Sequence, residues 1–143
     1  MSQQNVELIR RFEDSWARRD LEAALECVRT EMEFDWSASI SPLKGTYKGH
    51  DGLARFWTEM LDAFEYFSPE MVEVIECGPE ELITVDIVRA RGKGSGIEMQ
   101  ARGAMLWTMR EGKIVRGKMF QTKEEAIEAV GREAHAQARR RER

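Results

Sequence analysis

The sequence predicts a single α+β domain: a cone-shaped, curved, mostly antiparallel sheet wrapped by three N-terminal helices and a short C-terminal helix, enclosing a pocket. Two observations predict this class. Helical periodicity dominates up to about residue 68, apart from one strand at 31–37, whereas strand patterns follow one another from residue 71 to 120. Helices and strands are therefore segregated, which is typical of α+β folds.

Length and composition limit the range of functions. The chain has 143 residues, of which 42% are hydrophobic, so it can build one core. A net charge of -4 gives no basic surface for nucleic acid. No apolar run is long enough to span a bilayer, and the first residues are polar. We therefore expect a cytoplasmic protein without nucleic-acid or membrane partners.

Cysteine and histidine are scarce. Cys27 and Cys77 form no CxxC pair, and His50 and His135 are the only histidines. A disulfide scaffold or a zinc site would need more of these residues at closer spacing. No nucleotide or flavin motif is present either. We expect no cofactor and no metal.

The N-terminal segment predicts two helices. Apolar residues recur at helical spacing at Val6, Ile9, Phe12 and Trp16. This pattern predicts an amphipathic helix over 3–18. Asp20 is typical of an N-cap, so a second, short helix is expected after it.

A strand, a loop and a third helix follow. Residues 31–37 alternate between apolar and polar side chains, with Met32, Phe34 and Trp36 on one face. Residues 39–49 carry Pro42 and two glycines and are expected to form a loop. The third helix is expected to begin near residue 51 and to end before Ser68-Pro69, because proline disfavours helical geometry at the preceding residue.

Four strands and a helix complete the prediction. The strands are expected at 71–77, 81–91, 97–109 and 113–120, and their short connections require antiparallel pairing. Thr122 and Glu125 form a capping-box pattern that starts a short helix ending near Gly131. The predicted domain spans 1–131, and the charged residues 132–143 are expected to form a frayed or helical tail.

Several short motifs carry a resemblance to a known family. They are Arg19-Asp20-Leu21, the segment 47–52 (YKGHDG), the hairpin 91–96 (RGKGSG), the segment 107–114 (WTMREGKI) and the segment 124–131 (EEAIEAVG). In this order, over residues 3–131, the chain resembles the SnoaL-like branch of the nuclear transport factor 2-like superfamily, which includes polyketide cyclases and lies near the ketosteroid isomerases. The resemblance implies a bent sheet around a cavity and a homodimer packed through the outer face of the sheet.

The resemblance does not extend to the ketosteroid-isomerase catalytic groups. The position of that family's base falls at Ser41, and its two enolate-binding donors fall at Phe12 and Met105. A serine is no base unaided, and the other two side chains have no hydroxyl or carboxyl group. We therefore expect no steroid-isomerase chemistry.

Two aspartates are candidates for the single pocket carboxylate that polyketide cyclases use. Asp35 lies on the polar side of its strand, which favours a solvent-facing carboxylate. Asp86 lies in an apolar run and either faces outward or is held inside with a raised pKa. Arg102 with these two aspartates matches the residue types of a limonene-epoxide-hydrolase-type site, although an outer salt bridge suits its strand face better.

A set of aromatic and methionine side chains is the candidate pocket lining, with core packing as the alternative role. The set is Phe12, Trp16, Phe34, Trp36, Phe56, Met60, Met105, Trp107 and Phe120.

Three functions stay open at this point. The first is a homodimer that binds a small apolar or aromatic molecule without chemistry. The second is a cofactor-independent cyclase or isomerase that uses one pocket aspartate as general acid or base. The third is a structural partner domain whose core side chains fill the cone. The direction in which Asp86 and Asp35 point distinguishes them.

Overall fold

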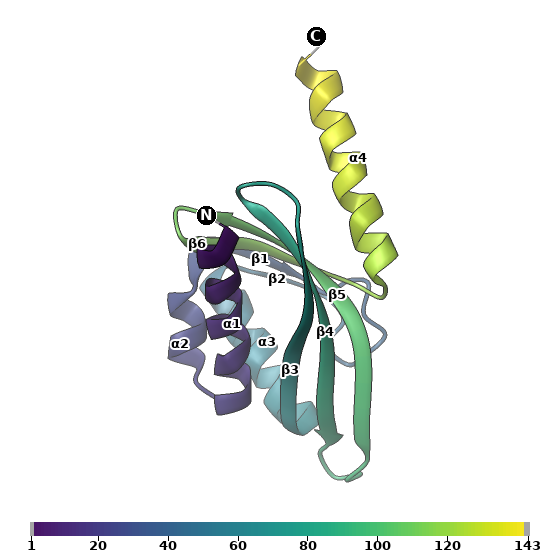
Figure 1. Cartoon of the computed structure of the whole chain (residues 1–143). Coiled ribbons are helices and arrows are strands. Elements are labelled where there is room, and N and C mark those ends of the chain that lie inside the picture. The colour runs from purple at the N-terminus through teal and green to yellow at the C-terminus, as the bar shows by residue number, and fades with distance from the viewer. Residues whose placement is uncertain (1, 142–143) are drawn as a thin grey trace.

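The computed structural model describes residues 2–141, which form four helices and one six-stranded sheet (Figure 1). The helices are α1 (Ser2–Arg18), α2 (Leu21–Glu26), α3 (Gly49–Ala63) and α4 (Lys123–Arg141). The strands are β1 (Val28–Asp35), β2 (Thr46–Lys48), β3 (Phe64–Glu76), β4 (Glu81–Gly92), β5 (Glu98–Arg110) and β6 (Lys113–Phe120). The predicted α+β class is confirmed, and the curved sheet is open rather than closed into a barrel.

The sheet places sequence-distant strands side by side. Its order is β2-β1-β6-β5-β4-β3, and every neighbouring pair is antiparallel except β1 and β6. The parallel pair aligns Phe34 with Gly117, and Gly117 in turn aligns with Trp107 on β5. The first strand of the chain thus lies between β2 and β6 and adjoins the last strand of the chain.

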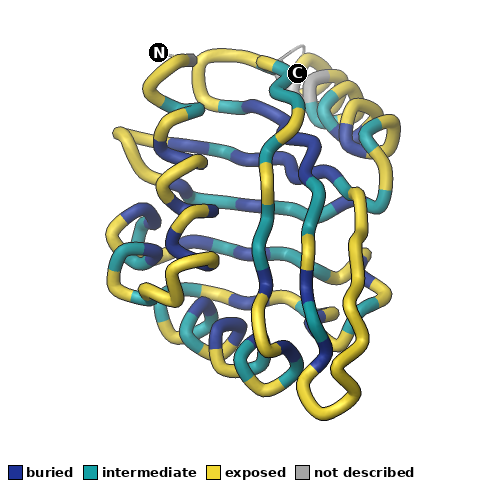
Figure 2. The backbone as a smooth tube through the Cα atoms, turned by 60° about the horizontal axis from the view of Figure 1, so that its bottom comes forward, coloured by how far each residue is buried: buried dark blue, intermediate teal, exposed yellow. Residues whose placement is uncertain are grey.

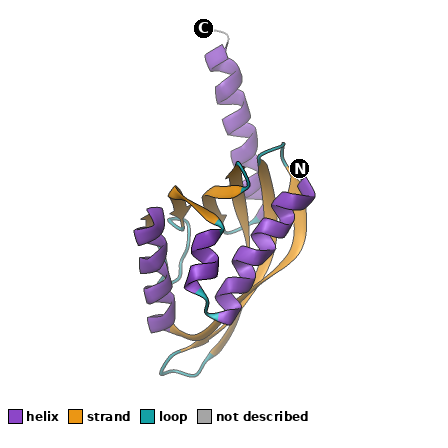
Figure 3. Cartoon of the chain, turned by 90° about the vertical axis from the view of Figure 1, so that its left-hand side faces the viewer, coloured by secondary structure: helices purple, strands orange, loops and turns teal. Residues whose placement is uncertain are grey.

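The helices cover the two faces of the sheet unequally. α1, α2 and α3 lie together on one face, as Figure 3 shows, and their apolar sides join the main core. α4 lies against the opposite face, where Ala126 and Ala129 pack on Ile83 and Leu106. The exposed residues concentrate at the β4–β5 hairpin and on the outer sides of the helices (Figure 2).

Two predictions about the middle of the chain are wrong. Residues 46–48 form β2 within the expected loop, because they pair with β1 from Glu33 to Asp35. The helix expected to reach Ser68-Pro69 ends at Ala63, and β3 begins at Phe64, so that Pro69 lies within a strand and pairs with Val88. β3 is an edge strand, where a missing N–H removes no bond to a further neighbour.

The C-terminal helix is longer than predicted. α4 does not end near Gly131 but continues to Arg141, so residues 132–141 of the expected tail are helical. Gly131 lies within the helix with open space around its Cα, and it does not adopt the left-handed conformation of a helix-ending glycine. The last two residues of that tail, 142–143, lie outside the described part of the chain.

Two predicted helix starts are confirmed by their hydrogen bonds. The Asp20 carboxylate accepts the backbone N–H of Ala23 at 3.1 Å and caps α2. At α4, the backbone N–H of Glu125 donates to the Thr122 hydroxyl and that of Thr122 donates to the Glu125 carboxylate, which completes the capping box. Over the described residues, no helix is long and apolar enough to cross a membrane.

Candidate functional site

A pocket of about 220 Å³ lies between the inner face of the sheet and the helices α1 and α3. Seven of the nine predicted lining residues contribute to its wall: Phe12, Trp16, Phe34, Trp36, Phe56, Met105 and Trp107. Polar atoms are few, so the pocket suits a molecule with a large apolar surface.

The other two predicted residues lie elsewhere. Met60 is buried in the main core and takes no part in the pocket wall. Phe120 packs with Ala126 of α4 on the outer side of the sheet, whereas its neighbour Met119 lines the pocket. Successive strand residues point to opposite faces of the sheet, so an error of one residue in a prediction moves the side chain from the inner face to the outer face.

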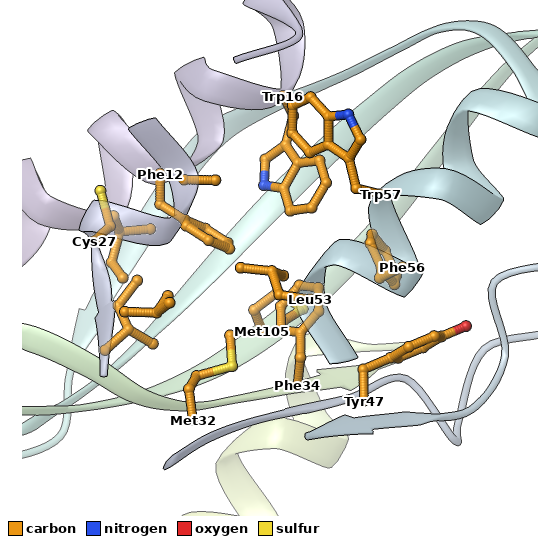
Figure 4. Close-up of a cluster of buried hydrophobic side chains, with 14 of the residues drawn as sticks. Phe12, Trp16, Cys27, Met32, Phe34, Tyr47, Leu53, Phe56, Trp57 and Met105 are labelled. Carbon is orange, nitrogen blue, oxygen red and sulfur yellow. The ribbon is translucent and has the colours of Figure 1, made fainter. Parts of the chain in front are cut away.

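The aromatic side chains of the wall contact one another directly. Phe12 meets Trp16 and Trp107 edge to face, with ring centroids 5.5 and 5.6 Å apart. Phe34 lies 4.9 Å from Phe56, again edge to face. Figure 4 shows Phe12, Trp16, Phe34 and Phe56 converging from α1, α3 and the sheet. Such interlocked rings hold the shape of the pocket before anything enters it.

Asp86 points inward from the middle of β4. It lines the pocket together with Val88 and Ala90, which follow it at alternate positions on the same strand. The residue is only 5% exposed, and it is opposed on β5 by Gly103, which has no side chain. A carboxyl group therefore lies in a mostly apolar wall.

A chain of hydrogen bonds orients this carboxyl group. The indole Nε1–H of Trp107 donates to the Thr84 hydroxyl at 2.9 Å, and that hydroxyl donates to Asp86 Oδ2 at 2.9 Å. Because the indole nitrogen can only donate, it fixes the Thr84 hydroxyl as an acceptor on one side and a donor on the other. Asp86 Oδ2 therefore acts as a hydrogen-bond acceptor.

Asp86 lies beside a second buried carboxyl group, that of Glu13. Oδ1 is buried and receives no ordinary N–H or O–H donor from the described residues. The Glu13 carboxyl of α1 hydrogen-bonds Asp86, and two carboxyl groups can bond only if one of them carries a proton. A protonated Glu13 supplies the hydrogen of this bond.

The pKa shifts of the pair agree with this arrangement. Burial raises the pKa of Glu13, and the Asp86 charge and hydrogen bond raise it further, while Arg10 opposes the shift. Burial also raises the pKa of Asp86, against the hydrogen bonds of Glu13 and Thr84, which lower it. Glu13 therefore holds the proton and Asp86 the charge, within a coupled pair.

Asp35, the other predicted carboxylate, lies away from this pair and is not part of the pocket wall. Its Oδ1 accepts the backbone N–H of Ser37 at 2.9 Å and the Thr46 hydroxyl at 3.4 Å, so it closes the turn between β1 and β2. Partial burial raises its pKa, but these hydrogen bonds and Lys118 together lower it below the ordinary value. Asp35 is thus a partly exposed, ionised turn residue.

The structure also locates the other residues that the sequence analysis singled out. Ser41, Phe12 and Met105, where ketosteroid isomerases carry their catalytic groups, all line the pocket, and none brings a carboxyl or phenol group. Arg102 is exposed at the rim and shares its strand face with Ala104, which packs outward under α4. Arg102 is nevertheless among the residues that line the pocket with Asp86, whereas Asp35 is not, so the three residues do not form one site.

Glu13 is the site residue that the sequence reasoning missed. A signal for it exists, because Glu13 lies four residues after Ile9 and three before Trp16 and so falls within the buried stripe of α1. An acidic residue at such a position is either turned out of the stripe or buried with a partner. Here the partner is 73 residues away, on β4.

The sequence matches a known protein family over most of its length. The SnoaL-like domain pattern matches residues 9–117. The chain belongs to the SnoaL-like domain family. No curated protein matches this SnoaL-like domain. Within the described residues, no group of three or more His, Cys, Asp or Glu side chains could hold a metal ion.

Solved structures similar to this SnoaL-like domain share its fold at low identity. TerC, co-crystallised with polyporic acid, aligns with a TM-score of 0.73 at 21% identity, over 90% of this chain and 98% of TerC. A Mycobacterium tuberculosis protein in complex with estradiol-17beta-hemisuccinate aligns with a TM-score of 0.71 at 13% identity, over 85% and 95%. A Catenulispora acidiphila protein with a ketosteroid isomerase-like fold, in complex with trimethylamine, aligns with a TM-score of 0.71 at 11% identity, over 87% and 92%.

Proposed function

We propose that this SnoaL-like domain binds a small, flat, apolar or aromatic molecule in its pocket and moves a proton on that molecule with Asp86. The observation that carries the proposal is the inward carboxylate: Asp86 lines the pocket, is 5% exposed and is oriented by Thr84. Neighbours of the same fold that hold polyporic acid or estradiol-17beta-hemisuccinate support the binding part.

The chemistry that suits this site is proton abstraction next to a carbonyl group or from a hydroxyl. A carboxylate in an apolar wall is a stronger base than one in water, because burial raises its pKa. Steroid isomerisation is not proposed, since Phe12 and Met105 cannot donate to an enolate oxygen.

The proposal is tested with 2-tetralone, a flat bicyclic ketone with acidic hydrogens beside its carbonyl. In D2O, the full chain should exchange these hydrogens for deuterium, which is followed by proton NMR. Asp86→Asn should slow the exchange by about 100-fold or more, the usual contribution of a general base, while 2-tetralone still quenches the fluorescence of the pocket tryptophans.

The matched control is Asp35→Asn, the same chemical change outside the pocket wall. It should leave the exchange rate within about twofold of the unmodified chain. Binding without chemistry is the competing function: it predicts that 2-tetralone binds but exchanges no faster with the unmodified chain than with Asp86→Asn. Native mass spectrometry of freshly purified protein would identify a co-purified ligand and the number of subunits.

A further inference from the structure

The molecule has a second cavity on the other side of the Glu13 side chain. A cleft of about 390 Å³ opens between α1 and β3, bordered by Arg10, Asp14 and Met71 among others. Two residues, Glu13 and Pro69, line both this outer cleft and the apolar pocket. The wall between the two cavities thus contains one carboxyl side chain and one proline.

The two cavities differ in how readily protons from solvent can reach them. The pocket wall is mostly apolar, and besides the carboxyl pair its polar members are Ser39, Ser41, Arg102 and Gln121. The cleft is bordered by the charged residues Glu7, Arg10, Arg11 and Asp14 of α1. The β3 side of the cleft contributes Pro69 and Met71, which carry no charge. When a flat apolar molecule fills the pocket, water there is displaced, and protons taken from that molecule need another exit.

We propose that Glu13 carries protons between Asp86 and the outer cleft, so that the occupied pocket exchanges protons with solvent through its wall. This inference rests on the proposed function of Asp86. Glu13 is suited to the role because it is 7% exposed, hydrogen-bonds Asp86 on one side and borders the cleft on the other. Pro69, its companion in the wall, has no N–H and offers no such route.

The proton balance of the cycle is simple. At rest the pair holds one proton, on Glu13. Asp86 accepts a proton from the bound molecule, and Glu13 then releases its own to water in the cleft, which leaves a protonated Asp86 bonded to the Glu13 carboxylate. Arg10, the nearby cation that favours the charged form of Glu13, stabilises this intermediate. The proton on Asp86 then passes across the hydrogen bond to the Glu13 carboxylate and exchanges with water in the cleft. A solvent proton returns by the same path from Glu13 to Asp86, Asp86 donates it to the bound molecule, and Glu13 takes up another proton from the cleft, which restores the start.

The test uses the deuterium exchange of 2-tetralone in D2O by the full chain. Without the path, a proton taken by Asp86 returns to the same molecule and no deuterium enters. Glu13→Gln, which can still donate a hydrogen bond to Asp86, should therefore lower exchange about tenfold or more, with 2-tetralone affinity unchanged. Arg10→Leu should slow exchange about threefold or more, and Arg11→Leu, with the same loss of charge, should stay within about twofold.

Chemical rescue separates a proton carrier from a merely structural residue. Glu13→Ala opens the wall to the cleft, so added formate should restore exchange in proportion to its concentration, and chloride at equal ionic strength should not. Equal exchange by Glu13→Gln and the unmodified chain would overturn the path and leave the proposed function standing. Exchange by the unmodified chain no faster than by Asp86→Asn would overturn both.

Discussion

Glu13 and Asp86 are buried side by side in a wall of aromatic and aliphatic carbon, and this placement determines their chemistry. Two charged carboxylates there would repel each other and lose their hydration, so the pair keeps one proton. Thr84 stabilises the charge on Asp86 by donating a hydrogen bond to it, whereas burial and the neighbouring Asp86 charge raise the pKa of Glu13. This asymmetry favours Asp86 as the base in the proposed proton transfer.

The pH dependence of stability is a consequence of the raised pKa of Glu13. Above its ordinary value of 4.5, the unfolded chain releases this proton and the folded chain keeps it. Stability should therefore fall as pH rises, by up to about 1.4 kcal/mol per pH unit for one proton. Urea unfolding of Glu13→Gln between about pH 5 and pH 8 should show a shallower decline than the unmodified chain.

Asp35→Asn is the control for that measurement. The pKa of Asp35 is lowered from 3.8, so its contribution is present above that pH and is lost only as pH falls further. The decline in stability between about pH 5 and pH 8 should be the same as in the unmodified chain. Identical slopes for Glu13→Gln and the unmodified chain would show that Glu13 is ionised in the folded state.

At the scale of elements, a row of aligned residues crosses β1, β6 and β5 and includes Trp107, which helps to orient Asp86 on β4. Phe34, Gly117 and Trp107 are aligned across these strands, and a Cβ on Gly117 would lie 2.8 Å from Trp107 and 3.1 Å from Phe34. Because Gly117 has no side chain, both rings can occupy the space beside its Cα. Trp107 reaches Thr84 from this position.

Gly117→Ala should therefore destabilise the fold and loosen the orientation of Asp86. Overpacking of this kind costs about 1–3 kcal/mol, measurable by urea unfolding. Displacement of the Trp107 ring should also change its fluorescence. Gly131→Ala is the control: this glycine lies in α4 with nothing near it, and alanine there should stabilise the helix by about 0.5–1 kcal/mol.

At the scale of the whole molecule, α4 begins on the sheet and extends beyond it (Figure 1). Its contacts with the body come from Ala126, Ala129 and Val130, and the Glu133 carboxylate pairs with Arg116 at 3.2 Å. Because α4 already covers part of the outer face of the sheet, the homodimer through that face stays a proposal that has to accommodate this helix. Sedimentation measurements of the full chain would decide it.

Truncation of α4 gives a further prediction at this scale. Removal of residues 134–143 keeps every contact just named, so urea unfolding at low protein concentration should change by less than about 0.5 kcal/mol. Removal of 123–143 exposes Ile83 and Leu106 and should cost more than about 2 kcal/mol. A large loss on the shorter truncation would mean that residues 134–141 stabilise the chain through a partner.

The sequence by itself determined the class of fold, the starts of α2 and α4, and most of the pocket wall, because caps and periodic patterns act over a few residues. Tertiary structure decided the rest. The register of β4 turned Asp86 inward, the sheet edge admitted Pro69 into a strand, and the packing of α1 on the sheet brought Glu13 to Asp86. These outcomes depend on contacts between distant segments, which no local pattern encodes.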